Sequence, residues 1–493
     1  MLFNSTVFIF LFLPIVLAGY GVLSRCSPRR VAIAWLVGCS LLYYGWWEPR
    51  YLILIASSIA VNFNVGLWIQ RITRPGWRRI ALAAGILFNL LLLGYFKYAN
   101  FFVEAVTAVL DLSCVLSTIT LPLAISFFTF QQIAYLVDTF RGKAREGRFL
   151  DYCLFVTFFP QLIAGPIVHH QEMMSQFTRR RGYRLNTVDL SIGLTTFAIG
   201  LAKKVLIADH IARWSTPIFS IAEAGGAPTF LEAWVAVFAY SAQIYFDFSG
   251  YSDMAIGLGR CFGIRLPLNF NAPYKAANIV SFWRRWHMTL SRFLRDYLYI
   301  SLGGNRRGTA RRYLNLMLTM LLGGLWHGAG WTFIAWGGLH GLYLMIYHGW
   351  ESLCRKLGRT SRPSGRFGRI AGCGVTFLAV SVAWVFFRAA DFDAAFAFLR
   401  SMSGRHSIEW TSRIDMSNDE LWFIFVALLI WVGPTTQQIM GRIRRPIGAA
   451  ALRDRPSWQW RPASIWSWLT AGLFLYTLWF IASESSEFIY YQF

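Results

Sequence analysis

Long apolar runs recur along this chain of 493 residues, and each is about as long as a helix that crosses a membrane. Water-soluble domains need polar surface, but 56% of the residues are hydrophobic and only 14% are charged. We therefore expect an all-α polytopic membrane protein, with one integral membrane domain over residues 1–493. The runs expected to cross are 2–23, 31–47, 51–69, 80–96, 115–137, 187–208, 229–248, 370–387, 421–440 and 464–482.

The net charge of +23 does not indicate a nucleic-acid partner. The basic residues are divided among separate loops instead of forming one groove, and lysine and arginine gather in the cytoplasmic loops of membrane proteins. This rule predicts that both termini lie outside the membrane and that the basic loops meet lipid headgroups. Some basic residues fall in the predicted outer segments, and they are Arg50, Lys97, Lys203, Lys204, Arg213, Arg388, Arg400, Arg405 and Arg413.

Three regions do not fit simple crossings. Residues 151–168 are apolar but have basic clusters on both sides, which favours a re-entrant segment. Residues 256–312 are the most basic stretch and belong at the cytoplasmic face. Residues 313–349 have basic residues at both ends and glycines in the middle, which predicts a hairpin inserted into the membrane. Non-helical backbone at that depth requires protein or water around it, so the hairpin implies an internal cavity.

His327 is the first candidate for chemistry because it lies at the turn of that hairpin. Fourteen helical residues from Tyr313 rise about 21 Å, which places the imidazole well inside the membrane. Ionisable groups at that depth are costly and usually functional. A structural histidine that bonds to a carbonyl is the alternative, and the four nearby glycines favour close approach of a substrate or another backbone.

His287 is the second candidate, in the segment 281–298. Helical spacing places His287 on one face with Trp283, and the arginines of the segment on the other. These arginines indicate either a basic helix on the inner leaflet or a binding site for the phosphates of a cytosolic donor. The residues in question are Arg284, Arg285, Arg292 and Arg295.

Other polar groups are expected to be structural. Acids and amides at membrane depth usually pair with one another, although one of them is a candidate for orienting a histidine. These are Gln131, Gln132, Asp138, Gln161, Asp247 and Asp253. The scattered cysteines and the adjacent pair His169 and His170 lack the spacing of metal ligands, so we expect no metal and no permanently bound cofactor. His340 carries no motif that we can interpret.

Several segments together resemble the membrane-bound O-acyltransferase (MBOAT) family, and within it the bacterial branch that O-acetylates exported polysaccharides such as alginate. The resemblance covers essentially the whole chain, with core motifs in 115–350 and additional spans in 370–482. Its segments are WRRWH (283–287), TLS (289–291), FLRDYLYI (293–300), GGNR (303–306), LWHGA (325–329), FPQLIAGPI (159–167), GLAKK (200–204) and FIYYQF (488–493).

The resemblance implies a ring of tilted helices with re-entrant segments around a central tunnel. It implies that His327 is the catalytic histidine and that His287 is a second active-site position. Acetyl-CoA is the implied donor, held by Arg284, Arg285, Arg295, Trp283 and Trp326. A periplasmic acetyltransferase-like protein is the implied partner, and the bacterial inner membrane, with both termini periplasmic, the implied location.

His327 would act as a base on an acceptor hydroxyl, while His287 would orient the donor or stabilise an oxyanion. A covalent acetyl-histidine intermediate is less favoured. Two alternatives remain at this stage. One is a transporter or flippase for a polysaccharide or lipid, although no two-half repeat is evident. The other is a D-alanyl transferase of the same family.

Overall fold

The computed structural model describes the chain apart from residues 111–118, 146, 164, 178–184, 361–364, 409–419, 442–458, 461–463 and 484–493. Within the described residues every regular element is helical, and there is no strand. The fold class expected from the sequence is therefore confirmed. The predicted basic loop around Arg179 to Arg184, Arg413 and the aromatic segment 488–493 lie outside the described residues.

Contacts within the chain define two compact units, which are described separately. Unit 1 takes Met1–Leu201, Tyr251–Leu268 and the described part of Met440–Glu487. Unit 2 takes Ala202–Gly250 and Asn269–Ile439. Every histidine and arginine that the sequence singles out as a candidate, from Trp283 to His327, belongs to unit 2. The interpretation of the chain as a single domain stays a prediction.

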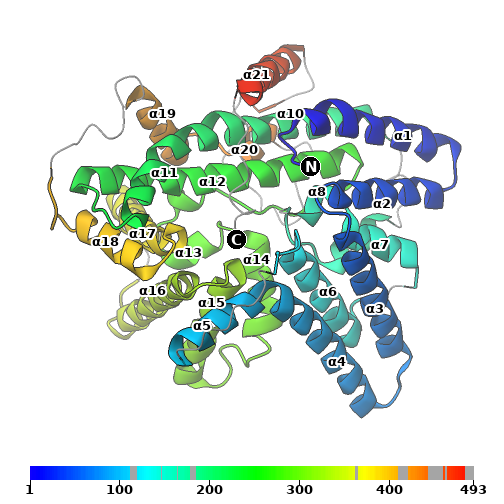
Figure 1. Cartoon of the computed structure of the whole chain (residues 1–493), viewed down its shortest axis with the longest axis horizontal. Helices are drawn as coiled ribbons and strands as arrows, with labels where there is room; N and C mark the ends of the chain where they lie inside the picture. The colour runs from blue at the N-terminus through cyan, green and yellow to red at the C-terminus, as the bar shows by residue number, and fades with distance from the viewer. Residues whose placement is uncertain are drawn as a thin grey trace. The chain divides into compact units, whose positions relative to one another are not determined.

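The helices of unit 1 follow the chain order of Figure 1. They are η1 (Phe8–Phe12), α1 (Leu13–Cys26), α2 (Arg29–Gly45), α3 (Tyr51–Arg71), α4 (Pro75–Leu93), η2 (Gly94–Tyr98), α5 (Ala99–Leu110), α6 (Ile125–Phe140), α7 (Phe149–Thr157), α8 (Phe159–Leu162), α9 (His170–Phe177), α10 (Thr187–Ala202) and α21 (Ser464–Ser483). The long helix α12 (Phe230–Cys261) contributes residues to both units.

Unit 2 contains the remaining helices. They are η3 (Lys203–Ala208), α11 (Asp209–Glu223), η4 (Pro273–Lys275), α13 (Ile279–Trp283), α14 (Met288–Phe293), η5 (Leu294–Tyr299), α15 (Gly308–His327), α16 (Trp331–Lys356), α17 (Gly365–Arg388), α18 (Phe392–Met402), α19 (Glu420–Trp431) and α20 (Thr436–Met440).

Five continuous helical stretches among the described residues are long and apolar enough to cross a membrane, so the chain is a multi-pass membrane protein. They are Phe8–Cys26, Tyr51–Arg71, Pro75–Thr107, Thr187–Glu223 and Gly365–Arg388. The other predicted crossings fall on shorter or more polar helices. For example, the run 115–137 is helical only from Ile125, and this helix, α6, buries Gln131 and Gln132.

The predicted re-entrant segment of unit 1 consists of two short helices. The backbone leaves helical geometry at Phe158, between α7 and α8, and Pro160 follows in the first turn of α8. The side chains of Gln131 and Gln161 both donate hydrogen bonds to the Phe155 carbonyl oxygen, at 2.6 and 2.7 Å. These amides satisfy a carbonyl at the helix end, which is the structural role expected of them. Neither helix is long enough to cross a membrane.

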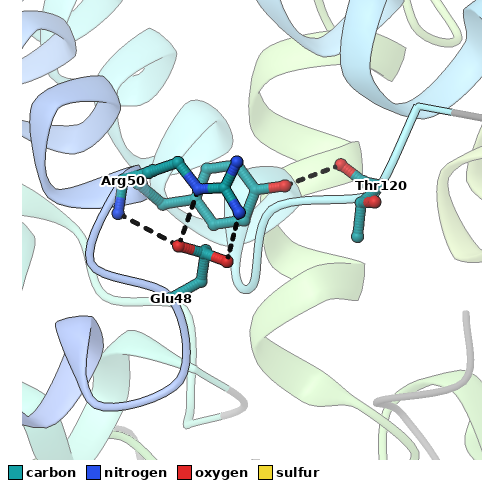
Figure 2. Close-up of polar contacts among 4 residues, drawn as sticks. Glu48, Arg50 and Thr120 are labelled. Atoms are coloured by element: carbon teal, nitrogen blue, oxygen red, sulfur yellow. Dashed lines mark hydrogen bonds and ion pairs between the residues drawn. The ribbon is translucent and has the colours of Figure 1, made fainter.

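Several basic residues of the predicted outer loops are neutralised by acids. Before α3, Arg50 forms a two-pronged ion pair with Glu48, with its Nε 3.0 Å and its Nη2 3.2 Å from the carboxylate oxygens (Figure 2). In unit 2, Arg388 pairs with Glu223 at 2.8 Å. Lys204 lies 2.7 Å from both Asp209 and Asp247. These pairs explain why basic residues occur on the predicted outer side without weakening the overall asymmetry of charge.

The predicted hairpin of unit 2 is formed by α15 and α16, joined by Gly328, Ala329 and Gly330. The two helices touch backbone to backbone at Gly324 and Gly337. A Cβ atom placed on Gly337 would clash with the Met320 carbonyl oxygen and lie 3.2 Å from the Gly324 Cα. Glycine permits this approach because it has no side chain. The contact fixes the helix end that carries His327.

Candidate active site

His287 interrupts the helix that the spacing of the segment predicts, so that part of the sequence interpretation is wrong. Helix α13 ends at Trp283 and α14 begins at Met288. His287 lies in between with φ 39° and ψ 54°, in the left-handed region. This conformation costs about 1–2 kcal/mol for a residue with a Cβ atom. The surrounding contacts therefore hold the imidazole in place against a local preference of the backbone.

Asn269 holds the imidazole of His287 by a side-chain hydrogen bond. The Asn269 Oδ1 atom lies 3.1 Å from His287 Nδ1, and it also accepts hydrogen bonds from the Thr289 hydroxyl at 2.9 Å and the Thr289 backbone N–H at 3.3 Å. The backbone N–H can only donate, so the atom facing it is the amide oxygen. His287 Nδ1 must then carry the proton.

The other ring nitrogen of His287, Nε2, therefore presents a lone pair. His287 has no exposed surface, and Nε2 has no hydrogen-bond partner among the described residues. Burial lowers the pKa of His287 to about 3, so the ring is neutral at physiological pH. A neutral imidazole of this tautomer accepts a hydrogen bond at Nε2 and cannot donate one there, which disfavours the stabilisation of an oxyanion by His287.

His327 is the last residue of α15 and is only 4% exposed. Its ring centroid lies 6.3 Å from that of His287. The rings of Trp326, Trp336 and Phe387 approach it at 5.0, 5.0 and 5.4 Å. The structure thus brings the two predicted histidines together, from segments 40 residues apart in the numbering of the chain, within an aromatic enclosure.

His340 is a third buried histidine in this region, and the sequence gave it no role. It lies one turn after Trp336 on α16, and the Trp336 ring contacts both His327, at 5.0 Å, and His340, at 4.8 Å. Trp283 contacts His340 at 5.1 Å. Within the described residues, neither ring nitrogen of His340 has a hydrogen-bond partner. Unpaired buried polar atoms are rare in proteins, so this position is a candidate for contact with a polar ligand.

The predicted donor-binding residues fall into distinct environments. Trp283 and Trp326 belong to the aromatic enclosure around the histidines. Arg284 is exposed and Arg285 is half-buried. Arg295 forms a bidentate ion pair with Asp296, at 2.7 and 3.1 Å, which leaves it less charge to offer a ligand.

Sequence reasoning missed Asn269 as the partner of His287. The asparagine precedes the histidine by 18 positions, and no periodicity relates an extended segment to a helix break. The two segments meet because Asn271 N–H donates to the Arg285 carbonyl and Met288 N–H donates to the Asn269 carbonyl, both at 2.9 Å. Among the described residues, no group of three or more histidine, cysteine, aspartate or glutamate side chains has the arrangement of a metal site.

The fold and the site define a class: an all-helical, multi-pass membrane protein that encloses a pair of histidines beside a glycine-packed hairpin. A family model described as "MBOAT, membrane-bound O-acyltransferase family" matches residues 141–380. The peptidoglycan O-acetyltransferase of Helicobacter pylori is 40% identical, over all of this chain and 98% of the relative.

Further relatives agree with this match. The probable alginate O-acetylase AlgI of Azotobacter vinelandii is 42% identical over 87% of this chain and 83% of the relative. The teichoic acid D-alanyltransferase of Bacillus subtilis is 28% identical over 55% of this chain and 69% of the relative. The chain belongs to the membrane-bound O-acyltransferase family, and it is an O-acyltransferase.

Replacement of Asn269 by alanine is expected to lower the transferase rate about 10- to 100-fold, because the His287 ring loses the bond that sets its tautomer and direction. The rates of Asn269→Ala, His287→Ala and the double variant should be measured side by side. If Asn269 acts through His287, the double variant is no slower than His287→Ala. Independent, multiplying losses would contradict this positioning role.

Proposed function

We propose that this protein takes acetyl groups from the cytosolic thioester acetyl-CoA and passes them across the membrane for O-acetylation of an exported polysaccharide such as alginate. The observation that carries the proposal is the pair of buried histidines, with ring centroids 6.3 Å apart, in a chain that aligns over its whole length with a peptidoglycan O-acetyltransferase. Peptidoglycan, alginate, cellulose and other exopolysaccharides are the polymers to be considered.

In the proposed mechanism, His327 takes the proton of an acceptor hydroxyl. The hydroxyl oxygen then attacks the thioester carbonyl carbon, the new C–O ester bond forms, and the C–S bond breaks. The proton passes from His327 to the departing thiolate, so that the histidine is neutral again. His287, with the lone pair of Nε2 directed away from Asn269, accepts a hydrogen bond from the hydroxyl or from an amide N–H of the donor.

The enclosure supports this chemistry in a second way. The rings around His327 include Trp326, Trp336 and Phe387, and they leave little room for bulk water. Exclusion of water favours transfer to a hydroxyl over hydrolysis of the thioester. It also favours the neutral form of a histidine, which is the form that acts as a base.

We place the protein in the bacterial inner membrane with both termini in the periplasm. The asymmetry of basic loops supports this orientation, since the basic stretch 256–312 would then face the cytosolic donor. The acceptor of an exported polymer lies on the other side. A periplasmic acetyltransferase-like protein of the same pathway would take the acetyl group and modify the polymer.

The second candidate is D-alanyl transfer, which the similarity to teichoic acid D-alanyltransferases favours. That similarity covers 54–55% of this chain at 26–28% identity, against 87–100% at 40–42% for the O-acetylating relatives quoted above. Acetyl transfer is therefore the better supported of the two.

Radiolabelled acetyl-CoA given to the purified full-length protein tests the proposal. We expect release of free CoA and label transfer to a polysaccharide or to a periplasmic partner protein, both dependent on His327. A D-alanyl thioester on a carrier protein serves as the competing donor. Turnover of the D-alanyl donor alone, or of neither donor, would refute the proposed function.

A further inference from the structure

Three basic residues from separate segments of unit 2 come together near η4. Lys275 is the last residue of η4, Arg285 follows α13, and Arg369 lies in the second turn of α17. In the predicted topology all three are on the cytoplasmic side, because 256–312 and the segment before α17 are basic loops. Lys275 and Arg369 were not among the candidates from the sequence.

The backbone contacts show how closely α17 approaches η4. A Cβ atom on Gly372 would lie 2.7 Å from the Ala277 carbonyl oxygen, and the Cys373 thiol donates to the Lys275 carbonyl at 3.4 Å. Arg369 precedes Cys373 by four residues, so the two share one face of the helix. Arg369 therefore lies on the face of α17 that is turned toward Lys275.

Hydrogen bonds to main-chain carbonyls hold the other two cations. Lys275 Nζ donates to the Gly433 carbonyl oxygen at 2.7 Å, and Arg285 Nη1 donates to the Asn271 carbonyl oxygen at 3.4 Å. Each of these bonds uses only one of the donors of the side chain. An ammonium has three N–H donors and a guanidinium has five, so both residues keep donors for a ligand.

The charges in this cluster are uncompensated within the described residues. Neither Lys275, Arg285 nor Arg369 forms an ion pair there, whereas Arg295 and Arg388 are both paired with acids. Partial burial and the neighbouring Arg285 lower the pKa of Lys275, and partial burial and Arg369 lower the pKa of Arg285. Like charges held together at partial burial repel one another, and a bound anion relieves this repulsion.

We propose that Lys275, Arg285 and Arg369 form a binding site for a phosphate group. Planar guanidinium groups match the geometry of phosphate oxygens, and the lysine adds a point charge. Two sources supply this chemistry on the cytoplasmic side: the phosphates of a coenzyme A donor, or the headgroup of an anionic lipid. The first source rests on the proposed function, and the second does not.

The test measures binding rather than turnover, so its outcome is separate from that of the proposed function. Full-length protein carrying His327→Ala is purified in detergent and titrated with coenzyme A, which has no acyl group to transfer. Lys275→Gln, Arg285→Gln and Arg369→Gln are compared with Arg295→Gln, which removes the same charge from an ion-paired residue. Glutamine at position 275 retains an N–H donor for the Gly433 carbonyl.

We expect each of the three variants to weaken coenzyme A binding about tenfold or more, and Arg295→Gln to leave it within about twofold. A second arm measures retention of phosphatidylglycerol, against neutral lipid, by the same variants in nanodiscs. Loss of lipid retention with unchanged coenzyme A binding assigns the site to a lipid headgroup. If all three variants bind both ligands as tightly as the Arg295→Gln control, or if the protein without these changes binds neither ligand, the phosphate site is refuted.

Discussion

Replacement of His327 by alanine is expected to lower the rate of acetyl transfer about 10²- to 10⁴-fold, which is the usual contribution of a positioned general base. The small side chain removes the base but leaves the backbone at the end of α15 unchanged, so the protein should still insert and fold. The measurement is the rate of acetyl transfer from labelled acetyl-CoA under single-turnover conditions, together with the helical content by circular dichroism.

His348→Ala is the matched control for this experiment. His348 lies on α16 of the same hairpin, is partly exposed, and has its Nδ1 atom 3.3 Å from the Glu351 carboxylate. We expect this variant to transfer acetyl groups at close to the original rate. Activity of His327→Ala within about threefold of the unmodified protein would exclude the base role, because removal of a general base costs far more than this.

Replacement of Gly337 by alanine is expected to lower the free energy of unfolding by about 3 kcal/mol, the upper end of the usual cost of overpacking. The added Cβ atom would meet the Met320 carbonyl oxygen and approach the Gly324 Cα to 3.2 Å. These are backbone atoms and cannot rotate away, so the helices of the hairpin must separate. Thermal unfolding in detergent measures the loss of stability.

Gly338→Ala provides the control, because a Cβ at Gly338 meets only the Leu321 side chain, at 3.4 Å. Its unfolding temperature should change by little. Because Trp336 precedes Gly337 and contacts His327, separation of the helices should also slow acetyl transfer. Equal unfolding temperatures for Gly337→Ala and Gly338→Ala would show that the hairpin tolerates separation and that its close contact does not support the site.

Much of unit 2 can be predicted because its signals are local. Basic residues at both ends and glycines in the middle predict a hairpin, and α15 does end at His327. The short helices α7 and α8 agree with the re-entrant segment, since Pro160 and the flanking charges are readable in the sequence. Burial of both histidines also agrees with the sequence, because each lies among apolar or aromatic neighbours.

The remaining features depend on contacts between distant segments. Helical spacing carried His287 through a continuous helix, whereas the bond to Asn269 and the pairing of two extended segments break the helix there. His340 gained its place from the packing of Trp336 and Trp283 around it, which no motif indicates. Tertiary contacts override local periodicity at these positions.

The left-handed backbone at His287 has a consequence for attempts to make this protein more robust. Glycine adopts φ 39° without strain, so a search for stabilising substitutions would tend to select it at this position. The more stable variant would lose the imidazole whose Nδ1 atom faces Asn269. Stability and activity therefore conflict at a single residue, and an engineering library for thermal tolerance should keep position 287 fixed as histidine.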